Sequence, residues 1–376
     1  MSSLARARAR RVLRFFRNSS VGRPRYRFAG YRPRVSTDLT PEQLSLVNFK
    51  RTVADFFTNE RYSFAKELPS GIQGGAIVIS ERDELGLQLR KLVAKFGNSR
   101  FDDEDLRSEI GWLSMLKGAP HIVQIVTTKN IRPHPQKTQI PRRPILVTEY
   151  VPNGTLGDMM ERVEESDGDA AVPNRILWFI FLCLARGITA LAYPLGNFGV
   201  GFSEEVPIED EFIPAGTEPI NLVHGDLHLN NVVVGELDPR HNEHWLCPII
   251  KLIDFGAAKQ LTLTHPRLGN KTGIAENIFS VGRVMQELAD RLASAPPLEA
   301  ELRDLINRCL KMNLMTRPSL EELEKVLEEG IRSGSLDYQE KRTPVAFNES
   351  TIALERWVRE FIFDAKSEST GRRLSI

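Results

Sequence analysis

The chain has 376 residues, 41% of them hydrophobic and 26% charged, a composition that excludes fibrous and disordered proteins and is typical of a globular one. The formal net charge is +1, but residues 1–34 contain eleven Arg and no acidic residue, so residues 35–376 carry −10. This acidic body argues against a nucleic-acid-binding protein. The three Cys, at positions 183, 247 and 309, form no C-x-x-C pair and predict buried thiols in a reducing, intracellular compartment.

The Arg-rich start predicts a basic, disordered segment over residues 1–40. Arg6, Arg10, Arg14 and Arg17 share one face of a helical wheel, and an amphipathic start without acidic residues is typical of a mitochondrial presequence. A nuclear or anionic-membrane address and a plain disordered tail are the alternatives. The expected location is therefore cytoplasmic or nuclear, with the mitochondrion as the alternative.

Strand patterns dominate residues 60–150. A charged turn joins the first two strands, and a helix with an acidic first turn follows and stops at Gly118. Two more strands come after it. The predicted strands cover 75–80, 87–96, 121–126 and 144–151, and the predicted helix covers 102–118.

Helical periodicity dominates after residue 151. The longest apolar stretch, 176–185, is shorter than the roughly 18 residues of a membrane span, so it predicts a buried helix and no transmembrane segment. Short strands are expected only within 221–256. The predicted helices cover 173–193, 275–294, 298–311, 319–331 and 350–364. The predicted class is α+β, with a small antiparallel β-sheet lobe plus one helix over 60–150, a larger helical lobe over 151–332 and a tail over 333–376.

Two motifs bring polar chemistry between apolar strands. The first, "LVHGDLHLNNVVV" at 222–234, places Asp226 and Asn231 in a loop flanked by two short strand-like runs. The second, "KLIDFG" at 251–256, delivers Asp254 onto a Phe-Gly turn. Either motif alone is weak, but their order and spacing together are specific.

The order H-x-D-x-x-x-x-N followed by D-F-G resembles the protein-kinase-like superfamily, in particular divergent fungal-type protein kinase domains with an HGD catalytic loop. The resemblance covers roughly residues 60–330 and implies a two-lobed protein-kinase-like fold that binds Mg²⁺ and ATP. It implies that Asp226 orients or deprotonates the acceptor hydroxyl. It also implies that Asn231 and Asp254 hold Mg²⁺ through hard oxygen ligands.

The same resemblance requires a Lys on the third strand and a Glu on the next helix. Lys95, in "LVAK", is expected to contact the α- and β-phosphates, with Lys91 on the same face as the alternative. Glu109 shares a helix face with three Leu, so its carboxylate needs a cationic partner. We expect an ion pair between Lys95 and Glu109.

The remaining nucleotide contacts follow from the resemblance. Gly71 and Gly74 stand where two phosphate-loop glycines belong, although Pro69 replaces the first. Val93 is expected to cover the adenine, and the backbones of Glu149 and Val151 to pair with its edge. Asp158 is either a ribose ligand or a helix cap.

The chain departs from the family at several positions. Gly225 replaces the Arg that pairs with an activation-loop phosphate, and His228 replaces a Lys, so the loop also resembles that of aminoglycoside and choline kinases. Only twenty residues separate Gly256 from Asn277, which stands in place of an Asp, and no A-P-E occurs between them. Arg317, whose usual partner is that Glu, is expected to pair with Glu276 or to cap a helix.

The insert 236–248 contains His241, His244 and Cys247, whose spacing loosely permits a metal site. A solvated hairpin tip is the favoured interpretation, because no fourth ligand is evident.

The predicted function is an ATP-dependent phosphotransferase of the protein-kinase type that transfers the γ-phosphate to a hydroxyl, with protein Ser/Thr as the expected acceptor. Two alternatives remain open. One is a small-molecule kinase, which the altered loop and the missing peptide platform favour. The other is a catalytically weak pseudokinase scaffold that binds nucleotide.

Overall fold

A computed structural model describes residues 50–59, 61–68, 74–126, 143–166, 172–195, 206–239, 241, 244–291, 298–340 and 349–364. They all belong to one unit, Asn48–Ile376. The predicted basic segment 1–40 lies outside the described residues, as do Pro69 and Gly71.

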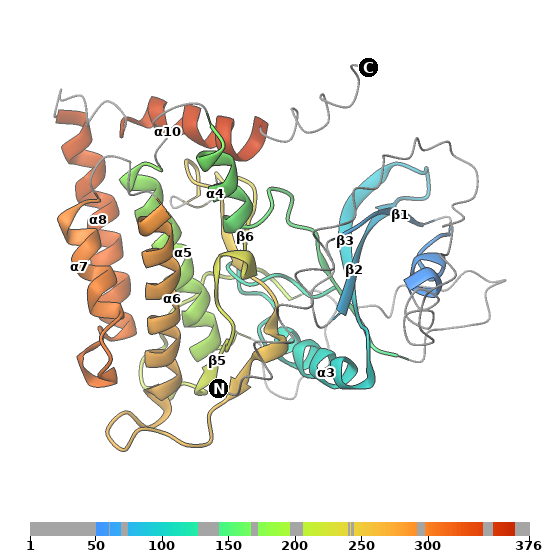
Figure 1. The fold of residues 1–376 in the computed structure, drawn as a ribbon, viewed down its shortest axis with the longest axis horizontal. Helices are drawn as coiled ribbons and strands as arrows, with labels where there is room; N and C mark the ends of the chain where they lie inside the picture. The colour runs from blue at the N-terminus through green and yellow to red at the C-terminus, as the bar shows by residue number, and fades with distance from the viewer. Residues whose placement is uncertain are drawn as a thin grey trace, which may run out of the picture. The chain divides into compact units, whose positions relative to one another are not determined.

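Four antiparallel strands form the main sheet in the order β1-β2-β3-β4. Figure 1 labels the first three of them. Their bounds are β1 Tyr62–Glu67, β2 Gly74–Arg82, β3 Gln88–Gly97 and β4 Ile145–Glu149. In β3 the residues alternate, with Leu92, Ala94 and Phe96 buried and Val93 and Lys95 partly exposed. The buried face packs with Val53 and Phe57 of the helical segment near residues 50–56, which gives the sheet its own small core.

Helix α3, Arg100–Met115, follows β3 directly. Ser99 and Asp102 form a capping box that fixes its first turn, so it begins two residues before the predicted helix. The predicted strand 121–126 is wrong, because its residues form only isolated bridges. Ile122 pairs with Leu252 in parallel and Ile125 pairs with Thr148 in antiparallel, so no continuous ladder develops.

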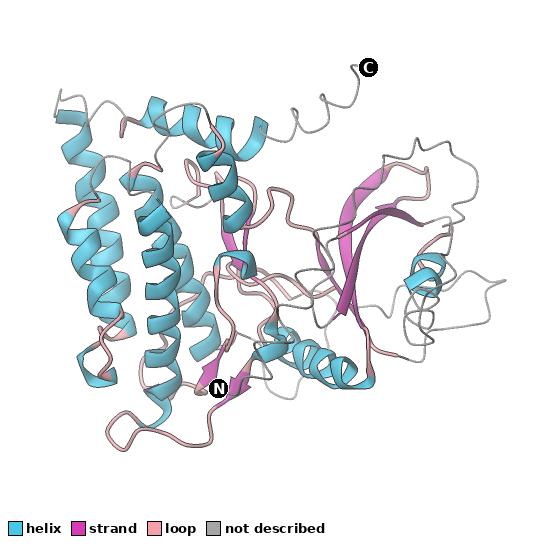
Figure 2. Cartoon of the chain, viewed as in Figure 1, coloured by secondary structure: helices cyan, strands magenta, loops and turns pink. Residues whose placement is uncertain are grey.

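The larger part is helical (Figure 2). Its helices are α4 Leu156–Glu164, α5 Asn174–Ala192, α6 Thr272–Arg291, α7 Ala300–Cys309 and α8 Leu320–Glu340. Helix α5 lies against α6 and α8, and every residue of it except Arg186 is buried. Its length and apolar character would suit a membrane span, but 94% of its apolar window is buried inside the protein, as expected for a core helix.

Short elements occupy residues 221–271. The short strands within 221–256 were predicted from the sequence. Strand β5, Leu222–Val223, pairs with β8, Lys259–Gln260, and β6, Val232–Val234, pairs with β7, Ile250–Leu252. Single 3-10 turns lie between and after them: η2 Leu229–Asn231, η3 Phe255–Ala257, η4 Gly269–Lys271 and, later, η5 Leu314–Thr316. The α+β class with a small antiparallel sheet is confirmed.

The C-terminal helix is part of the helical core. Helix α10, Thr351–Val358, continues as a π-helix, η6 Arg359–Asp364, and buries Leu354, Trp357 and Ile362. The predicted helix 350–364 is confirmed. Just before α10, Glu349 accepts hydrogen bonds from the backbone N–H groups of Asn174 and Arg175, at 2.7 and 3.1 Å. Its carboxylate therefore caps the start of α5.

Replacing Glu349 by Ala is expected to destabilise the protein by about 2 kcal/mol, because two buried N–H groups lose a charged acceptor. Urea unfolding at pH 7 measures this loss. Glu355→Ala, an exposed change on α10, is the control and should leave the unfolding midpoint unchanged. Equal midpoints for the two variants would remove the capping role.

Candidate functional site

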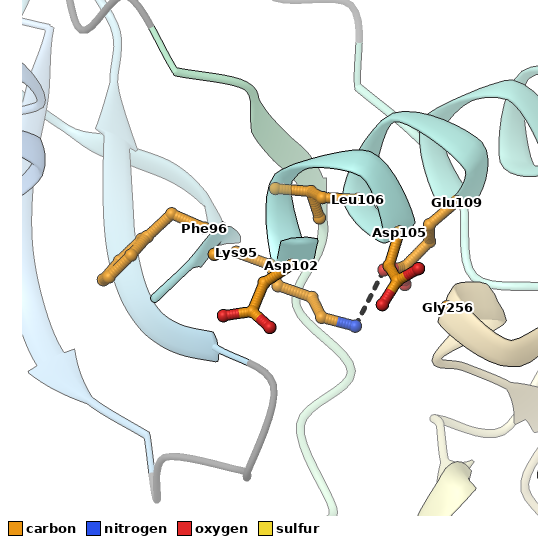
Figure 3. Close-up of a pocket in the computed structure, with 8 residues that line it drawn as sticks. Lys95, Phe96, Asp102, Asp105, Leu106, Glu109 and Gly256 are labelled. Atoms are coloured by element: carbon orange, nitrogen blue, oxygen red, sulfur yellow. Dashed lines mark hydrogen bonds and ion pairs between the residues drawn. The ribbon is translucent and has the colours of Figure 1, made fainter. Parts of the chain in front are cut away.

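Three charged side chains from three separate elements meet beside the sheet. Lys95 of β3 lies with its Nζ 2.8 Å from Glu109 Oε2 of α3 and 2.7 Å from Asp254 Oδ1, which follows β7. The ion pair between Lys95 and Glu109 predicted from the sequence is confirmed. Figure 3 shows this pair at one side of a hollow lined by Asp102, Asp105 and the turn at Gly256.

Burial and charge oppose each other in this cluster. Burial lowers the pKa of Lys95, but the carboxylates of Glu109 and Asp254 outweigh it and leave the pKa above its ordinary value. Burial raises the pKa of Glu109, with Lys95 opposing the rise. For Asp254, burial also acts to raise the pKa, but the Lys95 ammonium outweighs it and the pKa is lowered. Lys95 is therefore cationic and Asp254 anionic near neutral pH.

The turn that carries Asp254 is strained. Asp254 has φ 64° and ψ 72°, in the left-handed region that non-glycine residues rarely adopt. The next residue, Phe255, is fully buried and its N–H donates to Glu109 Oε1 at 3.3 Å. Glu109 thus holds both Lys95 and the turn, and the strain places the Asp254 carboxylate beside the ammonium.

The loop before β6 holds Asp226 and Asn231 together. The Asn231 amide Nδ2 donates to the backbone carbonyl of Asp226 at 2.7 Å and lies 3.4 Å from its carboxylate. The backbone carbonyl of Asn231 accepts from Ile253 N at 3.0 Å, which ties this loop to the residue before Asp254. The Asp226 carboxylate is 59% exposed, so it is free to meet a molecule from solvent, and His228 Nε2 lies 3.6 Å from it.

Asn277 anchors the same loop from α6. Its Oδ1 accepts from His224 N at 3.1 Å and its Nδ2 donates to the Leu222 carbonyl at 2.8 Å. The His224 ring is fully buried against Phe255, with Nε2 3.0 Å from the Ile253 carbonyl. An amide at position 277 supplies both a donor and an acceptor, which a carboxylate would not.

Burial lowers the pKa of His224 to about 4 from its ordinary 6.5. Between these values the unfolded chain binds a proton that the folded protein does not, so stability rises with pH across this window. Lowering the pH from 6.5 to 4 should therefore cost about 3 kcal/mol through this one ring.

Urea unfolding over that pH range tests the effect. His224→Asn should lose less stability than wild type as the pH falls. Parallel curves for wild type and His224→Asn would contradict the prediction.

Gly225 is required by the backbone. Its φ is 83°, and a Cβ there would lie 2.3 Å from the Ala257 carbonyl oxygen. The loop thus passes against the turn after Asp254 too closely for any side chain. The absence of an Arg at this position, noted in the sequence, has a steric cause.

The predicted adenine contacts lie in β3, at the end of β4 and just after it. Val93 and Lys95 share one face of β3, and Val93 pairs with Thr148 of β4. The backbone N–H of Glu149 donates to the backbone carbonyl of Gln124 at 3.0 Å, and the carboxylate of Glu149 accepts from Lys251 Nζ at 2.6 Å.

The Val151 N–H has no backbone partner among the described residues. Gly74 pairs with Gly97, and a Cβ on it would lie 2.5 Å from the Phe96 carbonyl oxygen, so strand packing alone requires this Gly.

Hydrogen bonds give the partners of two residues for which the sequence left alternatives open. Asp158 accepts from Thr155 N at 2.8 Å as the third residue of a capping box, so it caps α4. Arg317 forms no ion pair with Glu276 among the described residues. It donates to the backbone carbonyls of Lys311 and Ala275, at 2.8 and 2.7 Å, and lies over the Phe279 ring.

The metal candidates predicted in the insert are rearranged. The expectation of a solvated hairpin tip is wrong for His244 and Cys247, which are 3% and 1% exposed. His244 lies with His121 and Cys183 in a buried group whose ligand atoms are all within 4.8 Å of one another, and Cys247 is not part of it. Because these three residues lie about sixty positions apart, no motif spacing indicates the group.

No protein-family model matches this chain, and no curated protein matches its sequence.

Proposed function

We propose that the protein is an ATP-dependent phosphotransferase of the protein-kinase type, with a two-lobed protein-kinase-like fold. The observation that carries the proposal is the convergence of Lys95, Glu109 and Asp254 within 3 Å contacts, next to the loop that joins Asp226 to Asn231. These residues come from four separate parts of the sequence, and phosphoryl transfer needs this set of a cation, metal-binding oxygens and a positioned base.

The residues fit Mg²⁺ and ATP. Asp254 is anionic and its side chain is 37% exposed. The side-chain nitrogen of Asn231 donates to Asp226, so its side-chain oxygen could bind a metal. Carboxylate and amide oxygens are the ligands that Mg²⁺ prefers. Bound Mg²⁺ would neutralise phosphate charge, and Lys95 would exchange its contact with Asp254 for the α- and β-phosphates.

Asp226 would act on the acceptor. Its carboxylate accepts the proton of the acceptor hydroxyl as the hydroxyl oxygen forms a bond to the γ-phosphorus. The bond from that phosphorus to the β–γ bridging oxygen breaks, and ADP leaves with the bonding electron pair. The Asn231 contact to the Asp226 carbonyl holds the base in place during this step.

A second candidate is a small-molecule kinase. Only residues 261–271, with the single turn η4, connect β8 to α6, so little chain is present to form a platform for a peptide. A small hydroxyl compound needs no such platform. The acceptor class separates the two candidates.

The test has two stages. ATP with Mg²⁺ or Mn²⁺ should raise the melting temperature of the protein, and labelled γ-phosphate should pass to an acceptor from a panel of proteins, peptides, amino sugars and choline-like alcohols. Transfer only to small molecules selects the second candidate. Binding without transfer supports a pseudokinase scaffold. The absence of both binding and transfer would contradict the proposal.

A further inference from the structure

The buried group of His121, Cys183 and His244 has the arrangement of a metal centre. Their exposed fractions are 3%, 2% and 3%, and their ligand atoms all lie within 4.8 Å of one another. The two imidazoles face each other through their Nε2 atoms, 3.2 Å apart. Two ring nitrogens bound to one tetrahedral Zn²⁺ at about 2.05 Å lie roughly 3.3 Å apart, so the histidines already have this separation.

A buried carboxylate orients the first of these rings. Glu211 is 4% exposed, and it lies with Oε2 2.8 Å from His121 Nδ1 and Oε1 2.8 Å from the His121 backbone N–H. When Nδ1 donates its proton to Glu211, the lone pair of Nε2 points to His244. A carboxylate that fixes the second nitrogen of a metal-binding His is a regular feature of zinc sites.

We propose that His121, Cys183 and His244 bind a zinc ion. Binding displaces the single proton that fits between the two Nε2 atoms, which moves to Nδ1 of His244, and it releases the Cys183 thiol proton, so no redox partner is needed. The thiolate and Glu211 then balance the two positive charges of the ion inside the protein. Two imidazoles and one thiolate suit a borderline-soft metal rather than Mg²⁺.

The ion would connect segments that lie far apart in the sequence. Cys183 lies in the middle of α5, His244 in the connection between β6 and β7, and Glu211 in the irregular segment before β5. The His121 carbonyl accepts from Leu252 N in β7 at 2.9 Å. The ion would join these segments through three protein ligands, and the proposal does not depend on the phosphotransferase proposal.

Metal analysis of the full chain purified without chelator tests the site. We expect about one zinc per chain, and removal of the zinc should lower the melting temperature by about 5 °C or more. Cobalt added to the metal-free protein should give a thiolate-to-cobalt charge-transfer band, which reports a Cys ligand directly.

Matched cysteine variants identify the ligand. Cys183→Ser should abolish the cobalt band and the retained zinc. Cys309→Ser, in α7, and Cys247→Ser, in the same connection as His244, should keep both. If Cys183→Ser does not fold, the test rests on two other measurements. Wild type should show the cobalt band, and Cys247→Ser should show the same band. A wild type without zinc, cobalt band or chelator effect overturns the proposal, as does a band that depends on Cys247.

Discussion

Asp226→Asn should lower phosphoryl transfer by about 10²-fold or more while ATP with Mg²⁺ still raises the melting temperature as it does in wild type. The reason is that the Asp226 carboxylate faces solvent and would meet the acceptor rather than the nucleotide. The fold should be kept, because the contact from Asn231 goes mainly to the backbone carbonyl of Asp226, which Asn retains.

Asp254→Ala is the contrasting variant. It removes one of the two carboxylates paired with Lys95 and a proposed metal ligand, so both the ATP-induced thermal shift and transfer should be lost. Each variant is measured by thermal shift and by transfer of labelled phosphate. Normal turnover in Asp226→Asn would exclude this residue as the base, and normal ATP binding in Asp254→Ala would exclude metal binding there.

Glu109→Gln should separate activity from stability. Without the carboxylate, Lys95 is held only by Asp254 and is no longer positioned for phosphates, so transfer should fall by about 10²-fold. The folded protein raises the pKa of Glu109, so the wild-type carboxylate costs stability as the pH rises through that pKa. The raised pKa of Lys95 acts in the opposite direction, because Glu109 also stabilises the ammonium, so at pH 8 the two effects offset and the Gln variant should unfold within a few degrees of wild type.

Thermal unfolding and transfer assays on one preparation test this. Asp105→Asn, an exposed change on the same helix that also lines the hollow, is the control and should preserve both properties. A marked fall in the melting temperature of Glu109→Gln would mean that the ion pair stabilises the fold, and full activity would remove it from the site.

The centre of the site could be predicted because local patterns determine it. Two-residue alternation puts Lys95 on the face opposite Phe96, and helical spacing puts Glu109 on the buried face of α3. Side-chain direction within one strand or helix follows from the sequence. The turn at Asp254 and the loop at Asp226 were recognised by their motifs, but neither motif predicts the hydrogen bond from Ile253 N to the Asn231 backbone carbonyl that joins them.

Long-range partners could not be predicted. Residues 121–126 have the β-branched composition of a strand. Their two bridges, to Leu252 and Thr148, have opposite orientations, one parallel and one antiparallel, and only the tertiary fold shows this. The same limit hid the group of His121, Cys183 and His244, because pairing across about sixty positions leaves no periodic signal. Pairing distances of this kind are set by packing rather than by local propensity.

The cap on α5 has a consequence for synthesis on the ribosome. The carboxylate that satisfies the first N–H groups of α5 is contributed by Glu349, 175 residues after Asn174. At about 5 to 20 residues per second, the ribosome needs roughly 9 to 35 s to reach it. During that time α5, the most apolar of the described helices, lacks the acceptor for its first N–H groups, so the start of this helix can be completed only after Glu349 has been synthesised.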